Sequence, residues 1–173
     1  MNVTELEKCI ELYGKDIYAF CRQLTYSQQE AEELYQDTFL KAMELLQKID
    51  AAQNPKSYLL SIALRLWKNH KKKYATRKRI ADMESLTEEQ QEIEENSSCS
   101  LEEEVIAREQ AARVQRAVQQ LEDKYRLPVY LHYMEELPLQ EIARVLKIPK
   151  GTVKSRLYQA RKSLKNMLME DLV

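Results

Sequence analysis

Residues 139–157 read LQEIARVLKIPKGTVKSRL, and this stretch decides the fold of the last quarter of the chain. Pro149 disfavours helix at the residue before it, so we predict one short helix ahead of it and a second helix after it. Ala143 is small enough to let the two helices cross closely, and Ile148 is placed to fill the turn. Apolar residues recur at helical spacing on the inner sides, namely Ile142 and Leu146 in the first helix and Val153, Leu157, Ala160 and Leu164 in the second. The pattern predicts a helix-turn-helix.

The outer side of the second helix is basic. From Lys147 to Asn166 the chain has seven basic residues and no acidic one. An apolar inner stripe combined with a basic outer side is typical of a helix that enters a groove of duplex DNA. We expect some outer side chains to contact base edges and others to contact phosphates. The expected base contacts are Lys154, Ser155, Tyr158 and Gln159, and the expected phosphate contacts are Lys150, Arg156 and Arg161.

A helix whose charged side merely faces solvent is the alternative for this segment. Such helices usually mix both signs of charge, and the rest of the chain shows that the separation here is systematic. Residues 1–81 carry 14 basic and 10 acidic side chains, residues 82–104 carry 10 acidic and no basic ones, and residues 105–173 carry 13 basic and 8 acidic ones. Two basic modules joined by an acidic segment favour the DNA-binding interpretation.

Helix-forming residues dominate the whole chain, and only two Gly and four Pro are available for turns. Capping patterns predict helix starts at Thr4, Ser27 and Asn54. Further helices are expected at about 101–121, 124–134, 138–146 and 150–169. We therefore expect an all-α protein with two small helical domains, 1–81 and 105–173. The segment 82–104 between them is rich in Glu, Gln and Ser, and we interpret it as a flexible linker.

A second basic segment runs from Arg65 to Arg79, with eight basic residues, no acidic one, and the aromatics Trp67 and Tyr74. Basic residues interleaved with aromatics suit single-stranded nucleic acid, because bases can stack while the phosphates are neutralised. The alternative is an amphipathic helix in which Trp67 is buried. The nucleic-acid interpretation is the one we favour.

Three segments in this order resemble the two-domain, extracytoplasmic-function (ECF) sigma factors of bacterial RNA polymerase. EAEELYQDTFL, residues 30–40, is similar to the core-binding helix of that family. PKSYLLSIA, residues 55–63, is similar to the start of its promoter-melting helix, and GTVKSRLYQAR, residues 151–161, to its recognition helix. The resemblance implies sigma region 2 at 1–81 and sigma region 4 at 105–173.

The resemblance also implies partners and sites. Glu33, Gln36 and Asp37 are expected to bind core RNA polymerase, and the C-terminal module is expected to read the −35 element of promoter DNA. The −10 element would be held and melted by Arg65, Lys68, Asn69 and Lys72. Family members are commonly restrained by an anti-sigma factor, often membrane-bound, and such a partner is expected here. The acidic linker would lie near the active-site channel of the polymerase.

Four positions depart from the family pattern. Tyr58 stands in place of the usual Trp, Arg65 in place of a common Asn, and Asn69 in place of an Asp. The two changes at Arg65 and Asn69 bear on how −10 bases are captured. Lys147 replaces the usual turn Gly, which predicts a strain of about 1 kcal/mol if the backbone is left-handed there.

Two other classes of function fit the sequence less well. A simple helix-turn-helix regulator would need neither the core-binding helix nor the second basic segment. An enzyme is disfavoured because His70 and His132 are not in a metal-ligand spacing and the chain has no Gly-rich phosphate loop. Three distant cysteines and the lack of a signal peptide or long apolar run favour a cytoplasmic protein with no cofactor and no metal.

Overall fold

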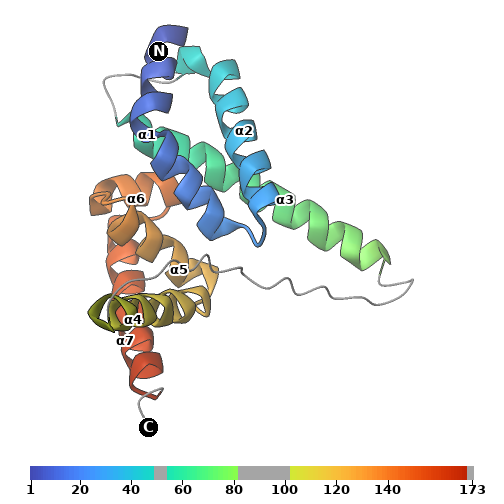
Figure 1. The fold of residues 1–173 in the computed structure, drawn as a ribbon. Helices are drawn as coiled ribbons and strands as arrows, with labels where there is room; N and C mark the ends of the chain where they lie inside the picture. Colours follow the sequence, from blue (N-terminus) through green and yellow to red (C-terminus); the bar gives the residue numbers. More distant parts are fainter. Residues whose placement is uncertain (49–53, 82–101, 171–173) are drawn as a thin grey trace. The chain divides into compact units, whose positions relative to one another are not determined.

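The computed structural model describes residues 1–48, 54–81 and 102–170, and every regular element within these ranges is a helix (Figure 1). The chain divides into two compact units, Met1–Glu94 and Glu95–Val173. The expected all-α fold with two helical domains is therefore confirmed. The expected flexible linker falls largely on residues 82–101, outside the described residues. In the described part of the chain, no helix is long and apolar enough to cross a membrane.

The N-terminal unit contains three helices that all contact one another. They are α1 (Val3–Leu24), α2 (Gln28–Glu44) and α3 (Pro55–Ala81), and a short 3₁₀ turn, η1 (Leu46–Lys48), follows α2. Ile17, Phe20, Leu34 and Leu59 are at most 1% exposed and form the centre of this unit. The three helices therefore share one apolar core.

Two of the three predicted helix starts in this unit are confirmed. The Ser27 hydroxyl accepts a hydrogen bond from the Glu30 N–H at 3.2 Å, and the Asn54 side chain accepts one from the Ser57 N–H at 3.2 Å. The start predicted at Thr4 is wrong, because Asn2 caps α1 instead. The Asn2 side chain accepts from the backbone N–H of Glu5, whose carboxylate accepts from the Asn2 N–H, each at 2.8 Å. This reciprocal pair satisfies two unpaired donors and begins the helix earlier.

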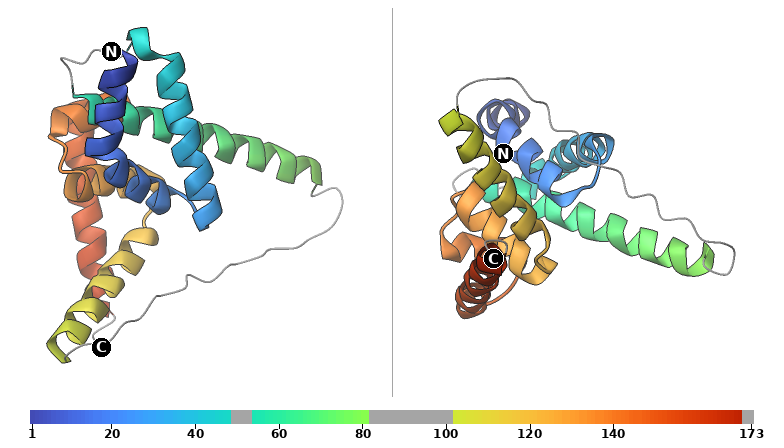
Figure 2. Two further views of the ribbon diagram at one scale, coloured as in Figure 1. Left: turned by 45° about the horizontal axis from the view of Figure 1, so that its top comes forward. Right: turned by 60° about the horizontal axis from the view of Figure 1, so that its bottom comes forward.

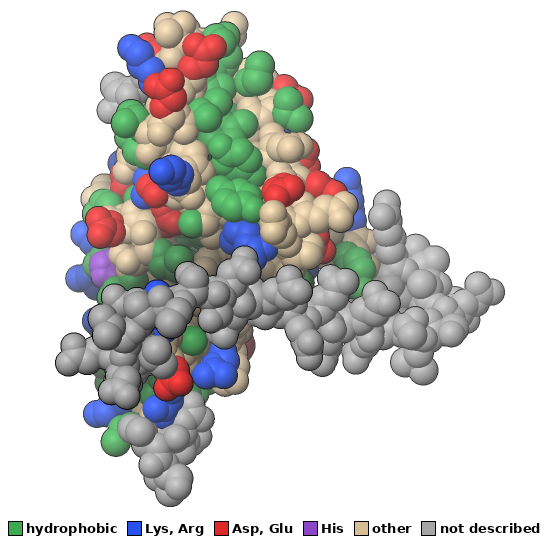
Figure 3. All heavy atoms as spheres, viewed as in Figure 1, with side chains coloured by type: hydrophobic (Ala, Val, Ile, Leu, Met, Phe, Trp, Pro, Cys, Tyr) green, Lys and Arg blue, Asp and Glu red, His purple; other side chains and the backbone are tan. Residues whose placement is uncertain are grey.

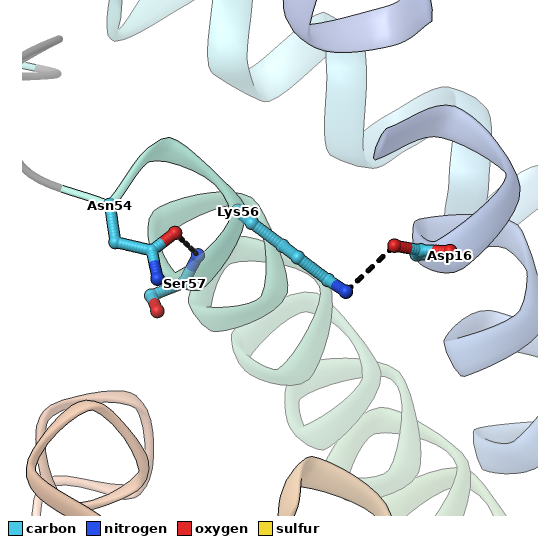
Figure 4. A network of polar contacts seen from close by, with 4 residues as sticks. All are labelled: Asp16, Asn54, Lys56 and Ser57. Atoms are coloured by element: carbon cyan, nitrogen blue, oxygen red, sulfur yellow. Dashed lines mark hydrogen bonds and ion pairs between the residues drawn. The ribbon is translucent and has the colours of Figure 1, made fainter. Parts of the chain in front are cut away.

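The first turn of α3 is fixed at two points (Figure 4). The Asn54 cap holds its backbone, and the Lys56 ammonium lies 2.7 Å from the Asp16 carboxylate of α1. The Lys56 side chain is only 15% exposed, whereas the Asp16 side chain is 48% exposed, so the pair is shielded from water mainly on the Lys56 side. The two contacts hold the first turn of α3 at α1.

A close approach between α1 and α2 depends on glycine. A Cβ added at Gly14 would lie 3.0 Å from the hydroxyl oxygen of Tyr35. The Tyr35 ring is itself held edge-to-face between Tyr18 and Phe39, with centroid distances of 5.7 and 4.9 Å. Burial raises the pKa of the Tyr35 phenol, with a smaller contribution from Cys21. Gly14 therefore gives the Tyr35 ring the space that it occupies.

The C-terminal half of α3, from Arg65 onward, forms an arm whose described side chains are mostly exposed. Trp67 is the last buried residue among the described side chains of this helix, and every residue from Lys68 to Ala75 is exposed. In the views of Figures 1 and 2 this part of α3 extends well beyond α1 and α2. The arm contains most of the second basic segment.

The C-terminal unit is built around its last helix. α7 (Lys150–Glu170) contacts α4 (Glu102–Gln119), α5 (Asp123–Val129) and α6 (Leu139–Leu146), and a π-helical turn, η2 (Tyr130–Met134), follows α5. Leu131, Ile142 and Val153 are completely buried. The hydroxyl of Tyr130 is also buried and has no hydrogen-bond partner among the described residues. Burial is the main cause that raises the pKa of this phenol.

The turn between α6 and α7 has the strained backbone expected from the sequence. Lys147 has φ 55° and ψ 46°, in the left-handed region. Its N–H donates to the Arg144 carbonyl at 3.3 Å, and the N–H of Ile148 donates to the Ala143 carbonyl at 3.0 Å. This is how a helix ends at a left-handed residue, usually Gly, and a lysine here carries a steric cost of about 1–2 kcal/mol.

Candidate functional site

The outer side of α7 is an exposed polar ridge. Val153, Leu157 and Ala160 are buried, as predicted, and turn the opposite side of the helix outward. Of the seven predicted DNA contacts, Arg156 is half-buried and the others are exposed: Lys150, Lys154, Ser155, Tyr158, Gln159 and Arg161. The Tyr158 ring is 63% exposed, which leaves its face and hydroxyl accessible to a partner. The ridge can therefore enter a groove without rearrangement of the core.

The predicted contacts occupy three strips of α7. Because successive residues are about 100° apart, Ser155, Tyr158 and Gln159 lie directly opposite the buried stripe. Lys154 lies on one flank, in line with Lys150 and Arg161, and Arg156 lies on the other flank. Lys162, which no predicted contact includes, falls on the central strip and is exposed. The Ser155 hydroxyl lies 3.0 Å from the Thr152 carbonyl, to which it donates.

No fold constraint requires glycine at the start of α7. A Cβ built on Gly151 would meet no atom within 4 Å, and its φ is not positive. The residue is exposed on the same strip as Ser155. The backbone of this first turn is thus accessible from outside.

The residues predicted to hold the −10 element share one side of α3. Arg65, Lys68, Asn69 and Lys72 are all exposed and fall within about 100° of one another around the helix. Trp67 does not join them, because it is only 8% exposed and lies on a different side. The buried-tryptophan alternative is therefore correct for this one aromatic residue. Tyr74, in contrast, is 70% exposed.

The residues predicted to bind polymerase also lie together. Glu33 and Gln36 are exposed and Asp37 is half-exposed, all on the side of α2 that faces away from the core. The Glu33 carboxylate accepts a hydrogen bond from the Gln29 side chain at 3.2 Å. Asp37 Oδ2 lies 3.9 Å from Nε2 of His70 on α3. The side chains that form this surface thus extend to the neighbouring helix.

Two apolar residues of this α2 surface were missed in the sequence. Leu40 is 59% exposed and Met43 is 53% exposed. Leu40 falls between Glu33 and Gln36 around the helix. Apolar side chains inside a polar rim are typical of the centre of a protein–protein interface. Figure 3 shows that green apolar side chains are exposed between charged ones on the face formed by α1 and α2. The sequence signal for Leu40 and Met43 was that both fall outside the buried residues of α2, which are Ala31, Leu34, Thr38, Phe39 and Ala42.

The described residues offer no metal site: no three His, Cys, Asp or Glu side chains among them are grouped to hold an ion. His132 of the C-terminal unit is half-buried, with Nδ1 3.4 Å from the Leu137 carbonyl oxygen, and stacks edge-to-face on Tyr133. His70 is the residue described above beside Asp37. His132 therefore contacts Leu137 and Tyr133, and His70 lies beside Asp37.

Comparison with known proteins gives matches in both units. The family "Sigma-70 region 2" matches residues 9–77, and "Sigma-70, region 4" matches residues 111–164. The ECF RNA polymerase sigma factor SigW of Bacillus subtilis is 30% identical over 165 residues, which cover 93% of this chain and 87% of SigW. The RNA polymerase sigma-H factor of Pseudomonas aeruginosa is 28% identical over 160 residues, which cover 90% of this chain and 82% of the sigma-H factor.

A solved structure shares the fold. The sigma factor RpoE of Bartonella quintana, crystallised with the anti-sigma factor NepR, superposes with a TM-score of 0.79 at 22% identity. The match covers 96% of this chain and 98% of that one.

Proposed function

Because this chain belongs to the ECF sigma factors of bacterial RNA polymerase, which direct the enzyme to promoters, we propose a division of that task among its three exposed surfaces. α2 binds core RNA polymerase through Glu33, Gln36 and Asp37. α3 holds the −10 element as it opens, and α7 reads the −35 element as duplex DNA. The protein acts as a binding factor without catalytic activity of its own, in the cytoplasm, where the polymerase works.

One observation carries the proposal: α7 buries Val153, Leu157 and Ala160 and exposes a ridge free of acidic residues. Phosphates attract the flanking residues Lys150, Arg156 and Arg161, which set affinity and its salt dependence. The central residues Ser155, Tyr158 and Gln159 reach the base edges, which set sequence preference. Lys154, on the flank that it shares with Lys150 and Arg161, is the fourth predicted base contact. A helix whose charged side merely faces solvent would not require apolar residues on one side and only basic and uncharged polar residues on the other.

The exposed basic side of α3 is suited to a single DNA strand rather than to a groove of duplex DNA. Arg65, Lys68 and Lys72 place three positive charges on one side of the helix, within about 10 Å along its axis at 1.5 Å per residue. Asn69 lies among them with an amide that can both donate to and accept from a base edge. Arg65 and Asn69 therefore replace the family's usual residues with side chains that still bind nucleic acid.

An anti-sigma factor is the further partner that we propose, since RpoE of Bartonella quintana was solved with one. Such a factor would cover surfaces that otherwise meet polymerase or DNA.

Transcription from a promoter library with bacterial core polymerase tests the function directly. We expect run-off products from a subset of promoters with shared −35 and −10 sequences, and none without the factor. The double variant Gln36→Ala, Asp37→Ala should retain its thermal stability within about 0.5 kcal/mol, as surface substitutions do, and should assemble poorly with core polymerase. Sequence-specific binding of the free protein without polymerase would instead favour a simple regulator.

A further inference from the structure

The arm of α3 has two different sides. The predicted −10 residues, Arg65, Lys68, Asn69 and Lys72, share the first side. His70, Lys71 and Tyr74 share a second side, roughly opposite the first at about 100° per residue. All seven residues are exposed. The arm therefore has one side that carries Arg65, Lys68, Asn69 and Lys72, and another on which Tyr74 lies with His70 and Lys71.

The second side of the arm adjoins the polymerase-binding surface of α2. His70 Nε2 lies 3.9 Å from Asp37 Oδ2, which joins the two helices at this point. The Lys71 ammonium lies 5.0 Å from the centroid of the Trp67 ring, whose side chain is buried. The 3.9 Å pair shows where the two helices meet and contributes little energy, because both side chains are about half exposed. The α2 surface thus continues onto the arm.

Tyr74 is the largest exposed group on this second side. Its ring is 70% exposed and follows His70 by one helical turn. A tyrosine buries a large, rigid ring at a low cost in conformational entropy and retains a hydroxyl for hydrogen bonding. Such residues are enriched among those that dominate protein–protein binding energies. Tyr74 is therefore the residue of this second side with the most surface to contribute to a protein contact.

We propose that His70, Lys71 and Tyr74 extend the polymerase-binding surface of α2 onto α3, with Tyr74 as the anchor. The proposal rests on the polymerase contact of Asp37 proposed above. The polymerase surface that fits this side has an apolar recess for the ring and acidic groups opposite Lys71. A DNA strand held by Lys68 and Lys72 would lie on the first side of the arm. Tyr74 is on the opposite side of a helix about 10–12 Å wide, so its side chain points away from that strand.

The test measures core-polymerase binding separately from DNA binding. Full-length protein labelled with a fluorophore is titrated with core polymerase without DNA, and the assembled holoenzyme is then titrated with a promoter fragment. Tyr74→Ala should weaken binding to core polymerase roughly ten- to thirty-fold. Once assembled at saturating polymerase, this variant should bind the promoter within about twofold of the wild type.

Two matched controls define the surface. Tyr26, in the connection between α1 and α2, is 82% exposed and lies outside both sides of the arm. Tyr26→Ala should therefore leave binding to core polymerase within about twofold. Lys72→Ala, on the first side, should retain polymerase binding and weaken promoter binding by the holoenzyme.

The outcomes separate this proposal from the one on which it rests. Normal core binding by Tyr74→Ala, with poor promoter binding by its holoenzyme, would overturn the proposal and assign the ring to DNA. Normal core binding by Tyr74→Ala together with weak binding by Asp37→Ala would overturn only the extension. Normal core binding by both variants would overturn the α2 surface as well. Circular dichroism melts confirm that each variant is folded.

Discussion

Replacing Lys147 by glycine tests the backbone of the turn between α6 and α7. The residue has φ 55° and ψ 46°, where a side chain with a Cβ costs roughly 1–2 kcal/mol. Glycine removes this cost but loses more backbone entropy on folding, which takes back about 0.5–1 kcal/mol. Lys147→Gly should therefore stabilise the C-terminal unit by about 1 kcal/mol. The ammonium is exposed, so its loss contributes little to stability.

Amide hydrogen exchange of the full-length chain gives a reading specific to this unit. A gain of about 1 kcal/mol slows exchange through unfolding of α6 and α7 roughly fivefold and leaves α1 and α2 unchanged. Lys147→Ala is the matched control, because it removes the same charge and keeps the Cβ. If the alanine and glycine variants protect α6 and α7 equally, the backbone at this position is not strained and the reasoning fails.

Three further predictions concern packing, pH and DNA. The change in unfolding free energy caused by Gly14→Ala should be less favourable, by at least about 0.5 kcal/mol, in the wild type than in a Tyr35→Phe background, because that background lacks the hydroxyl that the new Cβ meets. Urea unfolding of the four proteins measures this difference, and additive effects would contradict the contact. Burial raises the pKa of Tyr130, so the stability that its neutral form provides is complete below the ordinary pKa of about 10 and is lost as the pH rises through the higher folded value. Tyr130→Phe should therefore lose less stability than the wild type between about pH 9 and pH 12, and parallel losses would exclude this phenol as a source. Lys154→Ala should cost about 1–3 kcal/mol of binding free energy on the preferred −35 sequence and relax base preference. Arg161→Ala should weaken binding to all promoters alike and reduce the slope of affinity against salt by about one. Holoenzyme binding measured at several salt concentrations would show the reverse pattern if the recognition helix is rotated.

The helices and the buried side of α7 could be read from the sequence because they depend on local signals. Apolar spacing identified Val153, Leu157 and Ala160. The replacement of the family's usual turn Gly by Lys147 predicted strain if the backbone is left-handed there, as it is in the structure. The start of α1 was misplaced because Thr4 and Asn2 both head plausible capping boxes. Only the geometry decides which carboxylate reaches back to the cap.

The surfaces were harder to predict, because a sequence does not show which neighbouring helix a side chain meets. Trp67 and Tyr74 are alike in type and surroundings along the chain, yet one is buried and the other exposed. Leu40 is apolar, yet its position on α2 places it among polar side chains. Contacts between helices, such as Asp37 with His70, depend on helix packing that no local pattern encodes.

The arm of α3 has a consequence for the stability of the helix itself. Beyond Trp67 no residue up to Ala75 is buried, so tertiary packing does not support this part, and short helices without such support are marginal in water. Lysines three or four positions apart, such as Lys68 with Lys71 and Lys72, repel one another and weaken the helix further. Added salt screens this repulsion, and a phosphate strand along one side neutralises it more fully. Helix content in the arm should therefore rise with ionic strength in the free protein and rise again on a promoter, so part of the binding free energy is used to order the helix that makes the contact.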